Sequence, residues 1–93
     1  MGGFGHLYVT LGRYDEAARL SENGARANPA DYFNYACLAA SYAQLGRREE
    51  TKRAAAATLR AWPFFHLESF LTQFQRAEDR AVIGAGLRKA GLK

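Results

Sequence analysis

The sequence predicts an all-α fold of antiparallel helical hairpins, and three observations lead to this prediction. Segments 8–29 and 42–63 match each other at an offset of 34 residues. Glycine and proline stand at the same places in both segments, where helices would end. Apolar residues recur with the spacing of one helix face, and the clearest case is Tyr35, Leu38, Tyr42 and Leu45.

The composition suits one small soluble domain. Of the 93 residues, 48% are hydrophobic and 24% are charged, and the net charge is +4. The charges are scattered, so we expect solvated helix faces and no nucleic-acid surface. The single cysteine, Cys37, excludes an internal disulfide. No apolar run could span a membrane and no leader pattern opens the chain, so we expect a cytoplasmic protein without a membrane partner.

Nine identities support the 34-residue period, where chance would give about two. The pairs are Tyr8–Tyr42, Leu11–Leu45, Gly12–Gly46, Arg13–Arg47, Glu16–Glu50, Arg19–Arg53, Arg26–Arg60, Ala27–Ala61 and Pro29–Pro63. Gly12 and Gly46 suit the left-handed residue that follows many helices. Pro29 and Pro63 come just after a helix should end, since proline cannot continue it.

Four helices follow from these stops. Residues 4–11 are expected to end a first helix, and residues 14–27 to form its antiparallel partner. Residues 31–45 and 48–61 are expected to form a second hairpin. The aspartate of Asn28-Pro29-Ala30-Asp31 is a suitable N-cap for the third helix.

The repeat fades after Pro63, and two further helices are expected. The first carries an apolar face of Leu67, Phe70, Leu71 and Phe74. The second spans about residues 78–90 and ends at Gly91. Gly84 and Gly86 inside it indicate either close packing or local weakness. We expect this pair to close the end of the helical stack.

The segment Tyr8-Val9-Thr10-Leu11-Gly12-Arg13-Tyr14-Asp15-Glu16-Ala17, repeated in part at 42–50, resembles the central turn of the tetratricopeptide (TPR) family. The resemblance is weaker at Arg48 and Thr51, where that family has an aromatic and a small residue. It implies one domain with a partial repeat at 1–29, a repeat at 30–63 and a helical cap at 64–93. The tail 86–92 is also similar to the end of TPR arrays in larger bacterial signalling or regulatory proteins.

The resemblance also implies a partner-binding groove, because TPR proteins bind along the concave face lined by the first helix of each unit. On that face it places His6, Val9, Thr10, Arg13, Phe33, Ala36, Cys37, Ala40, Ala43 and Gln44. The charged clamp of some members is absent, so the groove would take an amphipathic helix or an extended apolar peptide. The alternative is that the chain's own C-terminal helices cover this strip.

The predicted function is therefore that of a non-catalytic protein-interaction module without cofactor or metal. His6 and His66 are far apart, no glycine-rich loop follows a strand, and Cys37 suits a buried position. One alternative is a homodimer, since the missing half-repeat would leave the apolar side of 14–27 uncovered. Another is a C-terminal regulatory segment of a larger signalling protein.

Overall fold

The computed structural model describes the backbone of residues 4–93 and the side chains of residues 7–93. Within that range the chain forms six helices and no strand, so the all-α prediction is confirmed. The helices are α1 (Phe4–Thr10), α2 (Tyr14–Ala27), α3 (Tyr32–Leu45), α4 (Arg48–Ala61), α5 (Leu67–Leu71) and α6 (Ala77–Lys89).

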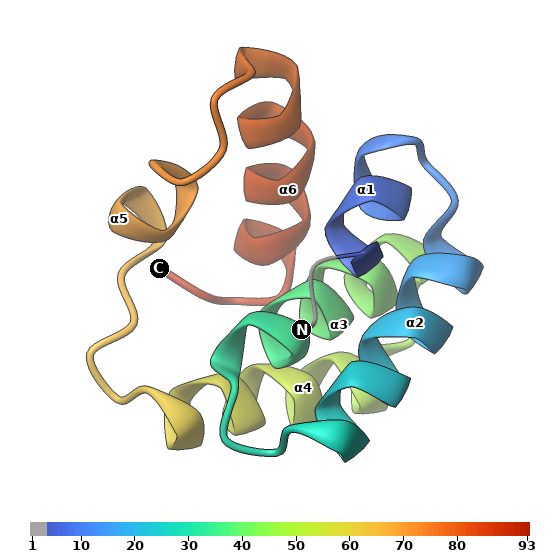
Figure 1. The fold of residues 1–93 in the computed structure, drawn as a ribbon, viewed down its shortest axis with the longest axis vertical. Coiled ribbons are helices and arrows are strands. Elements are labelled where there is room, and N and C mark those ends of the chain that lie inside the picture. Colours follow the sequence, from blue (N-terminus) through green and yellow to red (C-terminus); the bar gives the residue numbers. More distant parts are fainter. Residues whose placement is uncertain (1–3) are drawn as a thin grey trace.

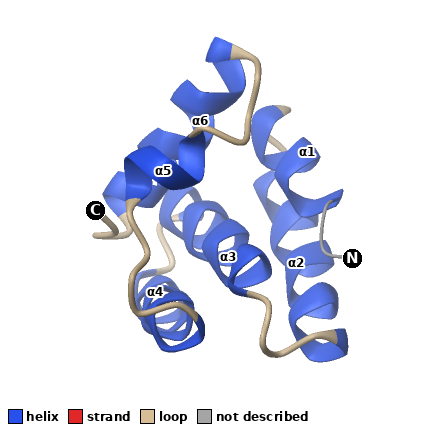
Figure 2. Cartoon of the chain, turned by 60° about the vertical axis from the view of Figure 1, so that its left-hand side comes forward, coloured by secondary structure: helices blue, strands red, loops and turns tan. Residues whose placement is uncertain are grey.

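The first four helices form two hairpins that lie side by side (Figures 1 and 2). Helix α1 packs against α2, and α3 packs against α4. Helix α3 also contacts α1 and α2, so it joins the two hairpins. Helix α6 packs on another side of α3, so α3 is the central helix of the fold.

The same turn closes the first helix of both hairpins. Gly12 and Gly46 each have a φ of +77°, in the left-handed region that side chains with a Cβ avoid. In each turn the amide after the glycine donates to the carbonyl five residues earlier, at 2.9 and 3.0 Å. This satisfies a helix-end carbonyl in the way the sequence predicts. Gly91, with a φ of +89°, ends α6 with the same hydrogen-bond pattern.

The helix starts and stops between the hairpins also agree with the sequence. Helix α2 ends at Ala27, two residues before Pro29, and α4 ends at Ala61, two residues before Pro63. The Asp31 side chain accepts a hydrogen bond from the Phe33 amide at 3.0 Å, so it caps α3.

The C-terminal pair differs from the expectation in its extent and position. Helix α5 stops at Leu71, although Phe74 beyond it is still buried. Helix α6 lies across α1 and α3, and α5 packs against α6 (Figure 1). The pair therefore covers the face that α1 and α3 share, and it does not continue the row beyond α4 as an end cap would.

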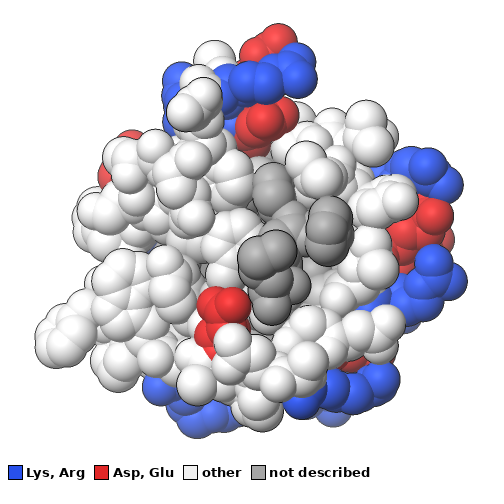
Figure 3. All heavy atoms as spheres, in the orientation of Figure 1, with Lys and Arg blue, Asp and Glu red and all other residues white. Residues whose placement is uncertain are grey.

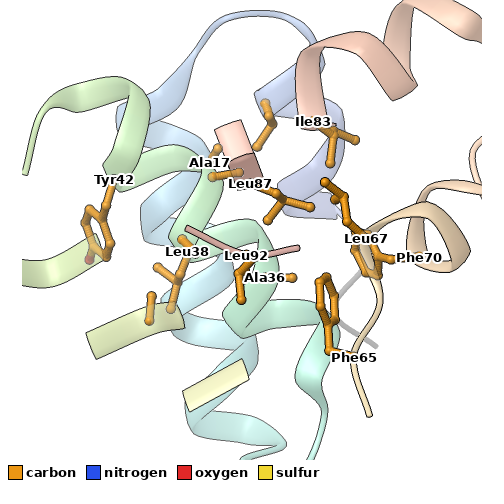
Figure 4. Close-up of a cluster of buried hydrophobic side chains, with 14 of the residues drawn as sticks. Ala17, Ala36, Leu38, Tyr42, Phe65, Leu67, Phe70, Ile83, Leu87 and Leu92 are labelled. Carbon is orange, nitrogen blue, oxygen red and sulfur yellow. The ribbon is translucent and has the colours of Figure 1, made fainter. Parts of the chain in front are cut away.

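One apolar core joins the hairpins to the C-terminal pair (Figure 4). Ile83 and Leu87 of α6 are almost fully buried, and Figure 4 shows them beside residues of the hairpins. An aromatic cluster extends this core where α3 begins, α4 ends and α5 begins. Its members are Tyr32, Phe33, Trp62, Phe65, Phe70 and Phe74, with ring centroids 4.6–6.4 Å apart.

Candidate functional site

Most of the α3 part of the strip predicted to bind a partner is buried. Cys37 is 2% exposed, and Ala36 and Ala40 are fully buried. Val9 on α1 is fully buried too, and Ala43 nearly so. These five residues therefore form part of the internal packing of the described structure.

Helix α6 approaches α3 closely because it has a glycine at the contact. A methyl group on Gly86 would lie 2.9 Å from the Ala40 Cβ and 3.1 Å from the Ala40 Cα. Such a distance is too short for two carbon atoms, so only glycine fits here without movement. The sequence left close packing and local weakness open for Gly86, and this contact confirms close packing.

The remaining predicted groove residues are also engaged within the chain. The Phe33 ring contacts the rings of Phe70 and Phe74, with centroids 5.7 and 6.1 Å apart. The amide oxygen of Gln44 accepts a hydrogen bond from Lys89 Nζ of α6 at 3.4 Å. The structure thus places Phe33, Ala40 and Gln44 of the predicted strip against the C-terminal part of the chain.

The α1 side of the predicted strip is only partly described. The Thr10 hydroxyl donates to the Leu7 carbonyl at 2.8 Å, within its own helix. The Arg13 guanidinium lies over the Tyr8 ring, 5.3 Å from its centroid, and pairs with Glu16. The side chain of His6 lies outside the described residues.

Cys37 is poorly suited to covalent chemistry. Burial raises the pKa of its thiol to about 12, with a smaller contribution from the Asp31 carboxylate, while the nearby Ser21 hydroxyl acts in the opposite direction. The thiolate is the reactive form, so this thiol is protonated and inert near neutral pH. Its role in the described structure is to fill space between helices.

Neither a metal-ligand cluster nor a candidate membrane span is found among the described residues. Among the side chains of residues 7–93, no three His, Cys, Asp or Glu residues are grouped to hold a metal ion. None of the six helices described is both long enough and apolar enough to be a candidate membrane span.

A second surface lies between α2 and α4, and we call it the α2–α4 groove. Its floor is formed by Tyr35, Leu38 and Tyr42 of α3, the apolar stripe noted in the sequence. Ala57 and Arg60 of α4 line both of its two hollows, which have volumes of about 330 and 370 Å³. Helices α2 and α4 contact α3 but not each other, so the space between them stays open in the described structure.

The α2–α4 groove is on the far side of α3 from α6. At 100° per residue, the floor residues Tyr35, Leu38 and Tyr42 point away from Ala36 and Ala40, which α6 covers. This groove was not predicted from the sequence. The sequence nevertheless contained a signal for it. Arg19 matches Arg53 and Arg26 matches Arg60 at the 34-residue period, although none of these arginines lies in the turns between helices.

No protein-family model matches the chain, and neither a curated protein nor a solved structure is significantly similar to it.

Proposed function

We propose that this chain is a non-catalytic module of TPR-type helical hairpins that binds another protein. The two hairpins with the same glycine turn, spaced by the 34-residue period, support the TPR-type assignment. The packing of α3 against both helices of the preceding hairpin supports it as well, because stacked repeats bury their apolar faces against neighbours.

The observation that carries the binding proposal is the set of large apolar side chains left exposed on each hairpin. On and just after α1, Leu7 and Leu11 are 48% and 68% exposed. On and just after α4, Leu59 and Phe64 are 44% and 84% exposed. Full burial of such a side chain contributes about 1.5–3 kcal/mol, so a protein partner that covers either pair gains stability.

Site-specific photo-crosslinking tests this proposal. A photo-reactive residue is placed at Leu11, at Phe64 and, as a control, at Glu49, whose side chain is 82% exposed among polar neighbours. The expected result in native extract is one discrete protein adduct at Leu11 or Phe64 and none at Glu49. The proposal is overturned if all three positions give the same adducts, or if none gives a protein adduct.

Self-association is the second candidate function, and the exposure of Leu7 and Leu11 favours it. The sequence suggested self-association for a different reason, an uncovered apolar side of residues 14–27. That reason is wrong, because Ala17, Ala18 and Ala25 of α2 are buried against their neighbours. If a second copy covers α1, sedimentation at tens of micromolar gives a dimer, and Leu11→Glu restores the monomer. A monomer of the unaltered chain at that concentration removes this candidate.

A further inference from the structure

The α2–α4 groove contains positively charged side chains that no carboxylate of the described residues neutralises. Arg53 and Arg60 of α4 line the groove, and both are exposed. No carboxylate among the described residues pairs with either of them. In Figure 3, Lys and Arg atoms gather along the lower and right-hand edges, where Figure 1 places α4 and α2.

The two acidic residues that line the groove already have partners. Glu22 accepts a hydrogen bond from the Tyr42 hydroxyl at 2.9 Å and pairs with Arg26 at 3.2 Å. Glu50 pairs with Arg47 at 3.6 Å. The charges left without a partner in the groove are therefore the two guanidinium groups on α4, separated by the small side chain of Ala57.

The 34-residue repeat places arginines at the equivalent positions of α2. Arg19 and Arg26 of α2 match Arg53 and Arg60 of α4, and all four are exposed. Arg19, Glu22 and Arg26 are spaced by three and four residues, so they share the side of α2 that contributes Glu22 to the groove. The groove lining itself takes Arg53 and Arg60 from α4 and Glu22 from α2. Arg19 and Arg26 are exposed on α2 within one helical turn of Glu22.

The size of the groove limits what can enter it. Hollows of about 330 and 370 Å³ are too small for a whole helix, which is about 10 Å wide, but they suit a few residues of extended chain. Arg53 and Arg60 are two helical turns apart, which corresponds to about 10.5 Å along α4. In a polyproline II segment, residues three apart share a face and are about 9.3 Å apart.

We propose that the α2–α4 groove binds an extended acidic segment of a protein partner. Two carboxylates three residues apart contact Arg53 and Arg60, and an apolar side chain between them packs on Tyr35 and Ala57. Arginine forms paired hydrogen bonds with carboxylates, which gives such a contact both orientation and strength. This inference rests on the proposed protein-binding function and names the surface and the partner chemistry.

The groove favours an acidic peptide over a nucleic acid. Glu22 and Glu50 line it beside the arginines, so positive charge is available only at Arg53 and Arg60, which suits two separate carboxylates better than a continuous phosphate backbone. The floor of Tyr35, Leu38 and Tyr42 offers apolar contact to a side chain between two carboxylates. A single-stranded oligonucleotide is therefore the appropriate competitor in the test.

The test is fluorescence anisotropy of the full chain with a short labelled peptide that carries two glutamates three residues apart around proline and leucine. We expect saturable binding at tens to hundreds of micromolar, and no binding of the same peptide with glutamine at both positions. The double variant Arg53→Glu/Arg60→Glu should bind about tenfold or more weakly. Ala57→Gln fills both hollows without a change of charge and should weaken binding similarly.

A matched control separates this site from general charge attraction. Arg48→Glu/Lys93→Glu removes the same charge from exposed positions outside the groove, and its binding should change by less than about twofold. Circular dichroism checks that each variant is folded. The inference is overturned if both double variants lose binding equally, if no saturable binding is found, or if the oligonucleotide binds more tightly than the peptide.

The outcome also distinguishes this inference from the proposed function. A protein adduct at Leu11 or Phe64 without peptide binding removes the acidic-peptide site and leaves the interaction module standing. Absence of both removes the interaction module as well.

Discussion

Gly24 of α2 leaves the space that the side chain of Asn34 on α3 occupies. A methyl group on Gly24 would lie 2.8 Å from the Asn34 Cγ and closer still to its Oδ1. Asn34 is fully buried, and neither polar atom of its amide has a hydrogen-bond partner among the described residues. The two positions are therefore coupled, and the α2–α3 contact depends on both.

The first prediction is that Gly24→Ala destabilises the fold by about 1–3 kcal/mol, because the added methyl group overpacks the contact. This loss exceeds the gain of about 1 kcal/mol in helix propensity. In Gly24→Ala/Asn34→Ala the clash is absent, so the double variant should be at least about 1 kcal/mol more stable than additivity predicts. Urea unfolding of all four proteins measures this coupling, and additive effects would contradict it.

The second prediction compares two glycines of α6. Gly86→Ala brings a methyl group against the Ala40 backbone, which cannot move easily, so we expect a loss of about 1–3 kcal/mol. At Gly84 the added methyl group meets the ends of the Leu71 and Arg88 side chains, at 3.1 and 3.2 Å. These ends can shift, so Gly84→Ala should be neutral or up to about 1 kcal/mol stabilising.

Thermal unfolding of the two single variants checks the α6 prediction. Equal effects at Gly84 and Gly86 would show that α6 is not seated against Ala40 in solution.

The third prediction concerns alkaline pH. Burial raises the pKa of the Cys37 thiol to about 12, and burial with the hydrogen bond to Glu22 raises the pKa of the Tyr42 hydroxyl to about 12. Both groups hold their proton more tightly in the folded state, so the stability they contribute is lost as pH rises through about 9 to 12. Urea midpoints should fall over this range, and less steeply in Cys37→Ala/Tyr42→Phe.

A thiol reagent gives an independent check of Cys37. At pH 8 the folded chain should react at least about a hundredfold more slowly than the chain in urea, because burial restricts both the thiolate and the access of the reagent. Rapid reaction of the folded protein would place Cys37 at the surface.

The fourth prediction uses two neighbouring phenylalanines in the α4–α5 loop. Phe64 is 84% exposed, so Phe64→Ser should change the free energy of unfolding by less than about 0.5 kcal/mol. Phe65 is 8% exposed, and its ring centroid lies 5.3 Å from that of Phe70, so Phe65→Ser should cost about 3 kcal/mol or more. The opposite ranking in chemical denaturation would contradict the packing of the aromatic cluster.

The local signals in the sequence were sufficient to predict where most of the helices begin and end. Gly12 and Gly46 predict left-handed turns, and Asp31 predicts a cap, because each acts on residues within one helical turn of itself. The expected extension of α5 to Phe74 is wrong for a reason that local patterns do not contain. Arg80 of α6 donates to the carbonyls of Phe74 and Gln75, which stabilises a loop at that point.

The position of α6 could not be predicted from periodicity. It depends on the contact between Gly86 and Ala40, which are far apart in the sequence, and a glycine in a helix gives no indication of which surface it approaches. The same holds for the candidate site. The resemblance to the TPR family predicted a strip of α3 that would face either a partner or the C-terminal helices. Only the packing shows that α6 lies against Ala40 and Gln44 of this strip and that a groove with Arg53 and Arg60 lies on the other side.

The contact between α1 and α6 joins the two ends of the fold, and this has a consequence for how it unfolds. In an open array of repeats each unit touches only its neighbours, so terminal units fray while the others persist. Here the first helix and the last support each other across α3, and loss of either exposes the core that both cover. The chain should therefore melt in one cooperative transition, with no stable half-folded array along the way.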